Sequence, residues 1–234
     1  MKPENLSLFL IPTVLAEDTS GTVLSPQIVD TVLNLDIFFV ENIRTARRFI
    51  SSLKLGKVID ELTFFELTKD TPLTETRQQL LNLTKNAGII SEAGCPGVAD
   101  PGAMAVKLAH EAGIKVVPLV GPSSILLALM ASGMSGQSFT FHGYLPIDKV
   151  QRKKAIQQLE RDAQMRNQTQ IFMETPFRNN QLMEAVIETC QSDTSLCVAS
   201  SITASDEFIK TLPVRQWRKE KPDLHKKPTI FLIG

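Results

Sequence analysis

The sequence has few cysteines and histidines and no long apolar run, and each of these absences argues against a class of protein. Its three cysteines, Cys95, Cys190 and Cys197, are an odd number without a C-x-x-C pair, which argues against a disulfide framework and favours reduced thiols. The three histidines are scattered without metal-ligand spacing, so we expect no metal site. No apolar run approaches the roughly 20 residues of a membrane span, and the N-terminus lacks the pattern of a secretion signal. We therefore expect a cytoplasmic protein without a membrane segment.

An excess of charge of one sign is also missing, because 25 Lys and Arg residues balance 25 Asp and Glu residues. This balance is not typical of a protein that grips nucleic acid over its whole surface. The basic residues are nevertheless clustered, and one cluster follows Leu145-Pro146: Lys149, Arg152, Lys153 and Lys154. A solvated helix face is the ordinary explanation of any one such cluster, and contact with RNA phosphates is the alternative.

The length of 234 residues and a hydrophobic content of 43% suit one large domain or two small ones. Apolar runs alternate with helical patterns in the first half, which predicts a parallel sheet. A Ser/Gly-rich link at 134–138 predicts a boundary between domains 1–135 and 136–234. Strands and helices do not alternate strictly in the second half, so we expect a mixed sheet there. The prediction is an α/β fold, mainly parallel in the N-terminal domain and mixed in the C-terminal domain.

Two Gly/Pro-rich loops within residues 91–129 organise the first half. Each follows a short apolar run and leads into a helical pattern, and parallel sheets bind ligands beyond the carboxyl ends of their strands. Asp100-Pro101 predicts a capped helix start, and Gly94 and Gly97 permit close backbone approaches. No Walker pattern and no G-x-G-x-x-G is present. Two well-capped turns without a ligand would explain the same composition, so these residues alone do not name a ligand.

Four segments carry a resemblance to a known family: AGCPGVADPG at 93–102, VVPLVGPSSILLALMASG at 116–133, FHGYLP at 141–146 and METPFR at 173–178. The chain resembles the tetrapyrrole methylase family of S-adenosylmethionine-dependent methyltransferases. It is most similar to the branch that methylates a cytidine ribose 2′-oxygen in small-subunit ribosomal RNA. The resemblance implies a two-domain fold with the S-adenosylmethionine cleft between the domains. It also implies a homodimer, and the small ribosomal subunit or its RNA as partner.

The resemblance also implies site residues. The expected cofactor contacts are carried over position by position: Leu15, Cys95, Val98, Ser123, Ser124, Met173 and Glu174. Glu41 and Arg44 follow the second predicted strand, where the branch keeps a Glu and an Arg. We expect them to be catalytic, with Glu41 as general base for a ribose hydroxyl. A surface ion pair between the two is an equal alternative. Glu92, Glu174 and Asp100 are the other carboxylates considered for the base.

Contacts with RNA are expected at the cluster after Leu145-Pro146, because the branch has a basic segment there too. Helical spacing brings the first three of its members to one side, and all four are expected to meet phosphates: Lys149, Arg152, Lys153 and Lys154.

The chain departs from the pattern of the branch at four places. Ala16 replaces a glycine, Asn42-Ile43 replace Asp-Thr, and Ser200-Ser201 replace Arg-Glu. An expected Asp-His-Asn-Glu run is missing near residues 57–67. Three functions therefore stay open. The first is methylation of ribosomal RNA, the second is methylation of a tetrapyrrole or other small acceptor, and the third is binding of S-adenosylmethionine or RNA with little activity.

Overall fold

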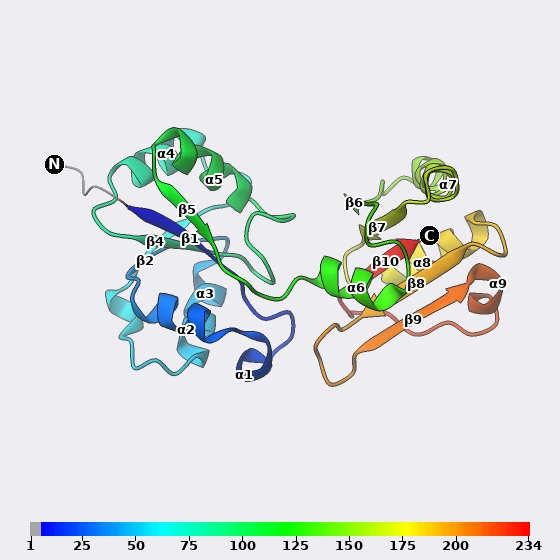
Figure 1. Ribbon diagram of the computed structural model, residues 1–234, viewed down its shortest axis with the longest axis horizontal. Coiled ribbons are helices and arrows are strands. Elements are labelled where there is room, and N and C mark those ends of the chain that lie inside the picture. The colour runs from blue at the N-terminus through cyan, green and yellow to red at the C-terminus, as the bar shows by residue number, and fades with distance from the viewer. Residues whose placement is uncertain (1–5) are drawn as a thin grey trace. The chain divides into compact units, whose positions relative to one another are not determined.

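The computed structural model describes residues 6–234. The chain divides between Ser123 and Ser124 into two compact units, each built around a five-stranded sheet (Figure 1). Helix α6 (Ser124–Ser132) packs on strands of the second unit. The boundary predicted from the Ser/Gly-rich link lies at the other end of this helix, because the link itself is part of the second unit.

The sheet of the first unit is parallel throughout, as predicted. Its strands are β1 (Ser7–Ile11), β2 (Ile37–Val40), β3 (Thr63–Glu66), β4 (Ala87–Ile90) and β5 (Lys115–Pro118). Their order is β3-β2-β4-β1-β5, with Leu8 beside both Ala87 and Val116. All four residues of β4 are buried, as expected of a parallel strand covered on both faces. The carboxyl ends of all five strands consequently meet at one edge of the sheet.

Helices cover both faces of this sheet, each with an apolar core beneath it (Figure 1). They are α1 (Ser20–Val23), α2 (Pro26–Leu33), α3 (Ile43–Ser52), a 3-10 turn (Ile59–Glu61), α4 (Leu73–Leu81) and α5 (Gly102–Glu111). Helices α4 and α5 lie over one face, and α2 and α3 over the other. Helix α3 was missed from the sequence, although Asn42 caps it and Ala46, Phe49 and Ile50 form its buried face.

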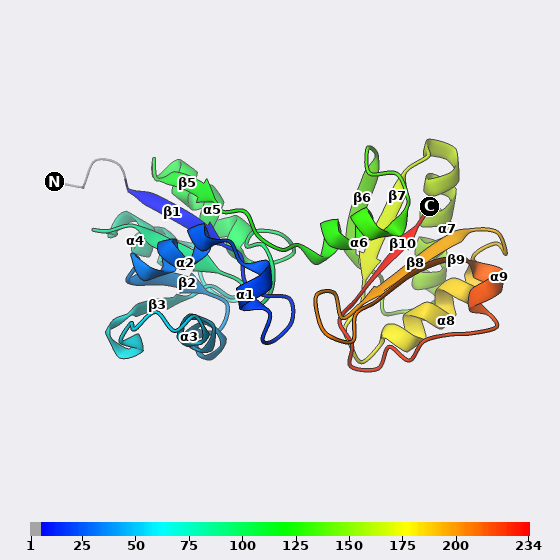
Figure 2. The ribbon, with the colours of Figure 1, turned by 60° about the horizontal axis from the view of Figure 1, so that its bottom comes forward.

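The sheet of the second unit is mixed, again as predicted. Its strands are β6 (Phe139–Tyr144), β7 (Thr169–Met173), β8 (Ser195–Ser200), β9 (Phe208–Pro213) and β10 (Thr229–Ile233), in the order β6-β7-β10-β8-β9. Strands β6 and β7 pair in parallel, and the other neighbours pair antiparallel. The parallel pair lies at one edge of the sheet (Figure 2).

Two sets of helices cover this second sheet. Helices α7 (Lys149–Arg166), α8 (Asn179–Thr189) and α9 (Val214–Trp217) enclose the main core, which contains Phe172, Phe231 and Trp217. Helix α6 contacts β8, β9 and β10 instead and supplies no residue to that core. The local pattern of Thr175-Pro176 predicts that a helix starts there. This prediction is wrong, because Thr175 accepts a backbone hydrogen bond from Arg178 in a turn and α8 starts at Asn179.

Candidate functional site

The loops after β1 and β4 are tied together at the carboxyl edge of the first sheet. Thr13 donates its N–H to the carbonyl of Gly94 at 2.9 Å, and its hydroxyl donates to the carbonyl of Ser91 at 3.4 Å. The Ser91 hydroxyl donates in turn to the Gly94 carbonyl at 3.2 Å. These bonds fix the loop after β1 against the loop after β4.

The loop after β5 joins the same group. The Cys95 thiol donates to the carbonyl of Pro122 at 3.3 Å, and a Cβ on Gly121 would lie 2.2 Å from Cβ of Pro12. A side chain at position 121 is therefore excluded by the loop after β1. Gly94 has a φ of +73°, and a Cβ there would lie 3.2 Å from the Leu15 side chain. Three loops thus converge so closely that glycine is required at their contacts.

Asp100 holds the loop after β4 in shape. Its Oδ1 accepts hydrogen bonds from the backbone N–H groups of Gly97 and Gly102, both at 2.7 Å. The second bond satisfies the first residue of α5, in accordance with the predicted capping role, although Pro101 occupies the cap position itself. Its Oδ2 is buried and has no hydrogen-bond partner among the described residues. Burial raises the pKa of this carboxyl, and the two N–H donors lower it.

Glu41 follows β2 and reaches the loop after β4, because β2 and β4 are neighbours in the sheet. Its carboxylate accepts a hydrogen bond from the backbone N–H of Glu92 at 3.1 Å. Burial raises the pKa of Glu41, the Glu92 N–H lowers it, and the nearby charges of Asp100 and Glu92 raise it further. A carboxylate that gains a proton more readily than usual is suited to act as a base.

Arg44 lies in the first turn of α3, where its side chain is exposed. Asn42 caps this helix and accepts from the N–H groups of Arg44 at 2.9 Å and Thr45 at 3.2 Å. The change from Asp to Asn relative to the branch therefore keeps a competent cap. Within residues 6–234, Arg44 and Glu41 form no ion pair.

The other cofactor contacts predicted in the first unit and at its end lie in, or directly after, the loops that follow β1, β4 and β5. Leu15 is in the loop after β1, against Gly94. Val98 is in the loop after β4, with 49% of its surface exposed. Ser123 ends the first unit, and Ser124 begins helix α6 in the second. Leu15, Cys95 and Val98 are thus brought to one edge of the first sheet.

Met173 and Glu174 lie at the carboxyl end of β7 in the second unit. The Glu174 carboxylate is largely buried and forms an ion pair with Arg178. This pairing occupies the side chain that the sequence offered as a site carboxylate and disfavours it as a general base. The positive charge of Arg178 compensates the negative charge of the largely buried Glu174 carboxylate.

Tyr144 was missed in the sequence, although it ends the strand beside Met173. Strand β6 pairs Phe141 with Ile171 but Tyr144 with Met173, so β6 contains one extra residue in between. Gly143 has a φ of +66° at this bulge. The sequence contains one indication of this bulge, because Gly143 directly precedes an aromatic residue near the end of a strand. The bulge determines on which face of the sheet Tyr144 lies.

The predicted RNA contacts lie at the start of α7. Asp148 caps this helix by accepting from the N–H of Gln151 at 2.9 Å. The side chains of Lys149, Lys153 and Lys154 are exposed, whereas Arg152 is half-buried. In the described part of the chain none of the four is in an ion pair, and Nε of Arg152 is buried without a hydrogen-bond partner. Their charge is therefore not neutralised by neighbouring carboxylates.

The serines that replace Arg-Glu of the branch are part of a hydrogen-bonded loop. Ser200 is buried and its hydroxyl is 3.1 Å from that of Thr229. Ser201 has a φ of +50° and contacts Asp206, which pairs with Lys227 at 2.9 Å. The side chains here satisfy one another, so the loop does not present the charges that the branch has.

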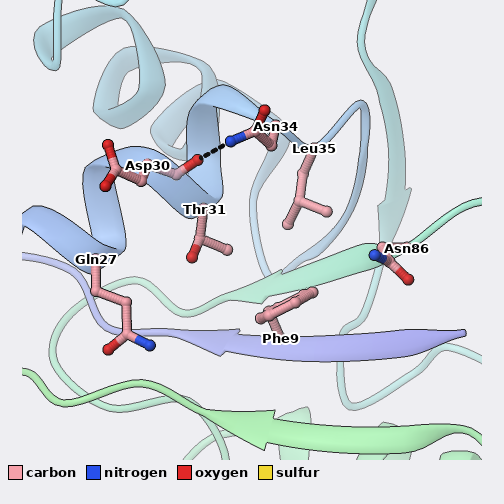
Figure 3. A pocket seen from close by; sticks show the side chains of 7 residues that line it. All are labelled: Phe9, Gln27, Asp30, Thr31, Asn34, Leu35 and Asn86. Atoms are coloured by element: carbon pink, nitrogen blue, oxygen red, sulfur yellow. Dashed lines mark hydrogen bonds between the residues drawn. The ribbon is translucent and has the colours of Figure 1, made fainter.

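The first unit also has an open hollow of about 390 Å³, away from the predicted residues (Figure 3). Gln27 and Thr31 of α2 face Phe9 of β1 across it, and Asn86 and Leu35 close its far end. Asn86 and Leu35 precede β4 and β2, so this end lies toward the amino ends of the strands. The hollow is therefore distinct from the loop cluster at the carboxyl edge.

Among residues 6–234, no group of three or more His, Cys, Asp or Glu side chains is arranged to hold a metal ion. In the same part of the chain, no helix combines the length and apolar character needed to cross a membrane.

Comparison with known proteins gives relatives along almost the whole chain. Ribosomal RNA small subunit methyltransferase I of Buchnera aphidicola is 28% identical over 229 residues, which are 97% of this chain and 77% of that protein. The protein of the same name from Bacillus subtilis is 30% identical over 204 residues, 87% of this chain and 66% of its own length. No protein-family model matches the chain.

Among solved structures, the methyltransferase CobJ has a similar fold. It has a TM-score of 0.64 and 16% sequence identity, and the match covers 99% of this chain and 94% of that one. At this identity the likeness shows the fold.

Proposed function

The chain belongs to the tetrapyrrole methylase family, and we propose that it is an S-adenosylmethionine-dependent methyltransferase acting on a ribose 2′-oxygen of small-subunit ribosomal RNA. The observation that carries the proposal is that the loop after β4 bonds both to the partly buried Glu41 carboxylate and to the loops after β1 and β5, in a chain related along its length to ribosomal RNA methyltransferases. The basic start of α7 favours RNA over a small acceptor.

The residues of the first unit fit a polar, charged cofactor. Gly94 keeps the backbone open beside Leu15, and Asp100 has a buried oxygen without a protein partner in the described residues. We propose that Leu15, Cys95, Val98, Ser123 and Ser124 bind S-adenosylmethionine. Contacts from Met173 and Glu174 remain predictions. The bound cofactor supplies a methyl group activated by a sulfonium.

The chemistry left to the protein is alignment and removal of a proton. Good alignment of reacting groups is worth up to about 7–11 kcal/mol. Glu41 takes the proton of the attacking ribose hydroxyl, and its raised pKa makes it a stronger base than an ordinary carboxylate. The N–H of Glu92 orients the carboxylate without neutralising it. Arg44 is proposed to contribute a positive charge beside the reacting ribose.

RNA is proposed to bind at the start of α7. Lys149, Lys153 and Lys154 are exposed and unpaired in the described part of the chain, and Arg152 lies between them in sequence. Cationic side chains of this kind contact phosphates and position a nucleic acid without reading its sequence. We further propose a homodimer in the cytoplasm, which light scattering and cell fractionation would test.

The deciding experiment offers labelled S-adenosylmethionine to the purified chain together with small ribosomal subunits, naked ribosomal RNA, or tetrapyrroles. We expect label on a ribose of the small-subunit RNA. Label on a tetrapyrrole alone would replace the RNA proposal with the small-acceptor one. Cofactor or RNA binding without any transfer would support a binding protein that has lost activity.

A further inference from the structure

We propose that Tyr144 is a stacking platform for an unpaired RNA base, next to the phosphate contacts at the start of α7. The inference rests on the proposed function, because it takes RNA as the ligand. It adds a residue that selects single-stranded over paired RNA, which the basic side chains alone do not do.

The bulge in β6 is the first step of the argument. Side chains alternate between the two faces of a strand, so one extra residue moves every later side chain to the opposite face. Because of the extra residue, Tyr144 pairs with Met173 and shares the face of Ile171. Leu145 lies instead in the core beneath α7. Without the bulge, the tyrosine would lie on the face that α7 and α8 cover.

The second step is the exposure of the ring. Helix α6 packs mainly on β8, β9 and β10 and supplies no residue to the core beneath α7 and α8. Tyr144 is 58% exposed. An exposed aromatic ring on a short edge strand is available for a planar partner.

The third step is the surroundings of the ring. The chain from β6 to α7 passes through Ile147 and Val150, which are 69% and 63% exposed. Lys149 and Lys153 follow at the start of the same helix, and Asp148, which precedes Lys149 in the sequence, accepts a hydrogen bond from Gln151 as the helix cap. Because α7 begins at the carboxyl end of β6, the ring and the cationic side chains belong to one end of the sheet.

This combination favours one occupant. Proteins that bind single-stranded nucleic acid combine cationic side chains for the backbone with aromatic side chains on which bases stack. A paired base is not available for stacking on a side chain, so the aromatic ring adds affinity for unpaired nucleotides only. The positive charge disfavours a basic partner, and it disfavours a second copy of the same surface.

The test compares variants of the full chain for binding to one RNA oligonucleotide, either single-stranded or annealed to its complement. Loss of one base stack weakens binding by about 5- to 150-fold. Tyr144→Ala should lose that much affinity for the single strand and little for the duplex. Tyr144→Phe should keep it, because the ring remains. Phe139→Ala is the matched control: it removes a 40% exposed ring at the other end of the same strand and should leave affinity unchanged.

The outcomes separate this inference from the proposed function. If the native chain binds no RNA, the proposed function fails and takes the inference with it. If the native chain binds RNA, and Tyr144→Ala binds the single strand and the duplex as tightly as the native chain does, only the stacking role is wrong. A change of mass in light scattering for Tyr144→Ala, without a change in RNA affinity, would assign the face to a contact between chains and overturn the inference. Melting temperatures near the native value would show that each variant is folded.

Discussion

In the first unit all five strands run parallel, whereas in the second unit only β6 and β7 do among the neighbouring pairs. The first sheet therefore gathers several loops at one edge, where burial and then the charge of Asp100 raise the pKa of Glu41 and of Cys95. The second sheet gathers the ends of one parallel pair, where Tyr144 and Met173 lie together. The direction of the strands thus decides how much chemistry each unit can assemble.

The units also differ in how far hydrogen bonds and ion pairs fix the residues of their proposed sites. The loops of the first unit are fixed by hydrogen bonds and by glycines that other loops contact. The basic residues at the start of α7 are exposed and without ion pairs in the described residues. We infer that the first unit supplies preorganised chemistry and that the second supplies adaptable contacts with a large substrate. The predictions below test this contrast.

The largest effect is expected at Glu41. Glu41→Gln keeps an acceptor for the Glu92 N–H but removes the base, so kcat should fall about 10²- to 10⁴-fold. For the native chain, methyl transfer should fall as the pH drops through a Glu41 pKa that burial raises above its ordinary value. Single-turnover rates against pH measure both effects.

The pH profile provides the control for this variant. Glu41→Gln should lose the acidic limb of the profile while its affinity for S-adenosylhomocysteine stays unchanged. A variant that retains both the native rate and the native acidic limb would contradict the assignment of Glu41 as base.

A smaller effect is expected from the start of α7. Lys149→Glu combined with Lys153→Glu should weaken RNA binding and leave cofactor affinity unchanged. Each phosphate contact contributes about 0.7–0.9 to the slope of log affinity against log salt, so losing two should flatten it by about 1.4–1.8. RNA titrations at several salt concentrations measure the slope. The reversal of Arg215 and Lys219, which are also basic and exposed, is a control that should leave the slope close to native.

Packing in the two units can be compared with one added methyl group. Gly121→Ala places a Cβ against the Pro12 ring, and overpacking of this kind costs about 1–3 kcal/mol in the free energy of unfolding. Gly136→Ala in the second unit meets nothing within 4 Å and should cost much less. Urea unfolding measures both. Equal stability of the two variants would show that the loops of the first unit are not tightly fixed.

The smallest effect concerns the rates at which the three thiols react. Cys95 is half-buried in the loop cluster, and burial raises its pKa, so it should be alkylated more slowly than a free cysteine. Burial and then the charge of Glu160 raise the pKa of Cys190 to about 12, and Cys197 is buried as well. Mass spectrometry of the native chain should therefore find the label on Cys95 first. Earlier labelling of Cys190 would contradict the packing of the second core.

The sequence predicted the sheets well, because buried strands are apolar runs that can be recognised locally. It failed at α3 and at the start of α8. The Glu-Asn-Ile-Arg segment was interpreted through its charged ends, so the cap at Asn42 went unnoticed. Pro176 lies where the local pattern predicts the start of α8, and its carbonyl instead accepts a hydrogen bond from the N–H of Lys226, in a distant part of the chain. Such tertiary bonds override a local start pattern.

The site was predictable as a set of loops but not as a set of contacts. The hydrogen bond between Glu41 and Glu92 depends on β2 and β4 being neighbours. The order of strands in a sheet cannot be inferred from local sequence patterns. The pairing of Glu174 with Arg178 is local, and its spacing was available in the sequence. The position of Tyr144 depends on a bulge that a single glycine only suggests.

The place of β1 in the first sheet has a consequence for synthesis of the chain. Strand β1 is made well before its two partners, β4 and β5, because Leu8 pairs with Ala87 and Val116. At about 5–20 residues per second, roughly 4–16 s pass before β4 follows β1 out of the ribosome. During that time an apolar strand with two open edges waits while β2 and β3 can already pair. We expect nascent chains that end before residue 118 to need a chaperone, and longer ones to close the sheet around β1.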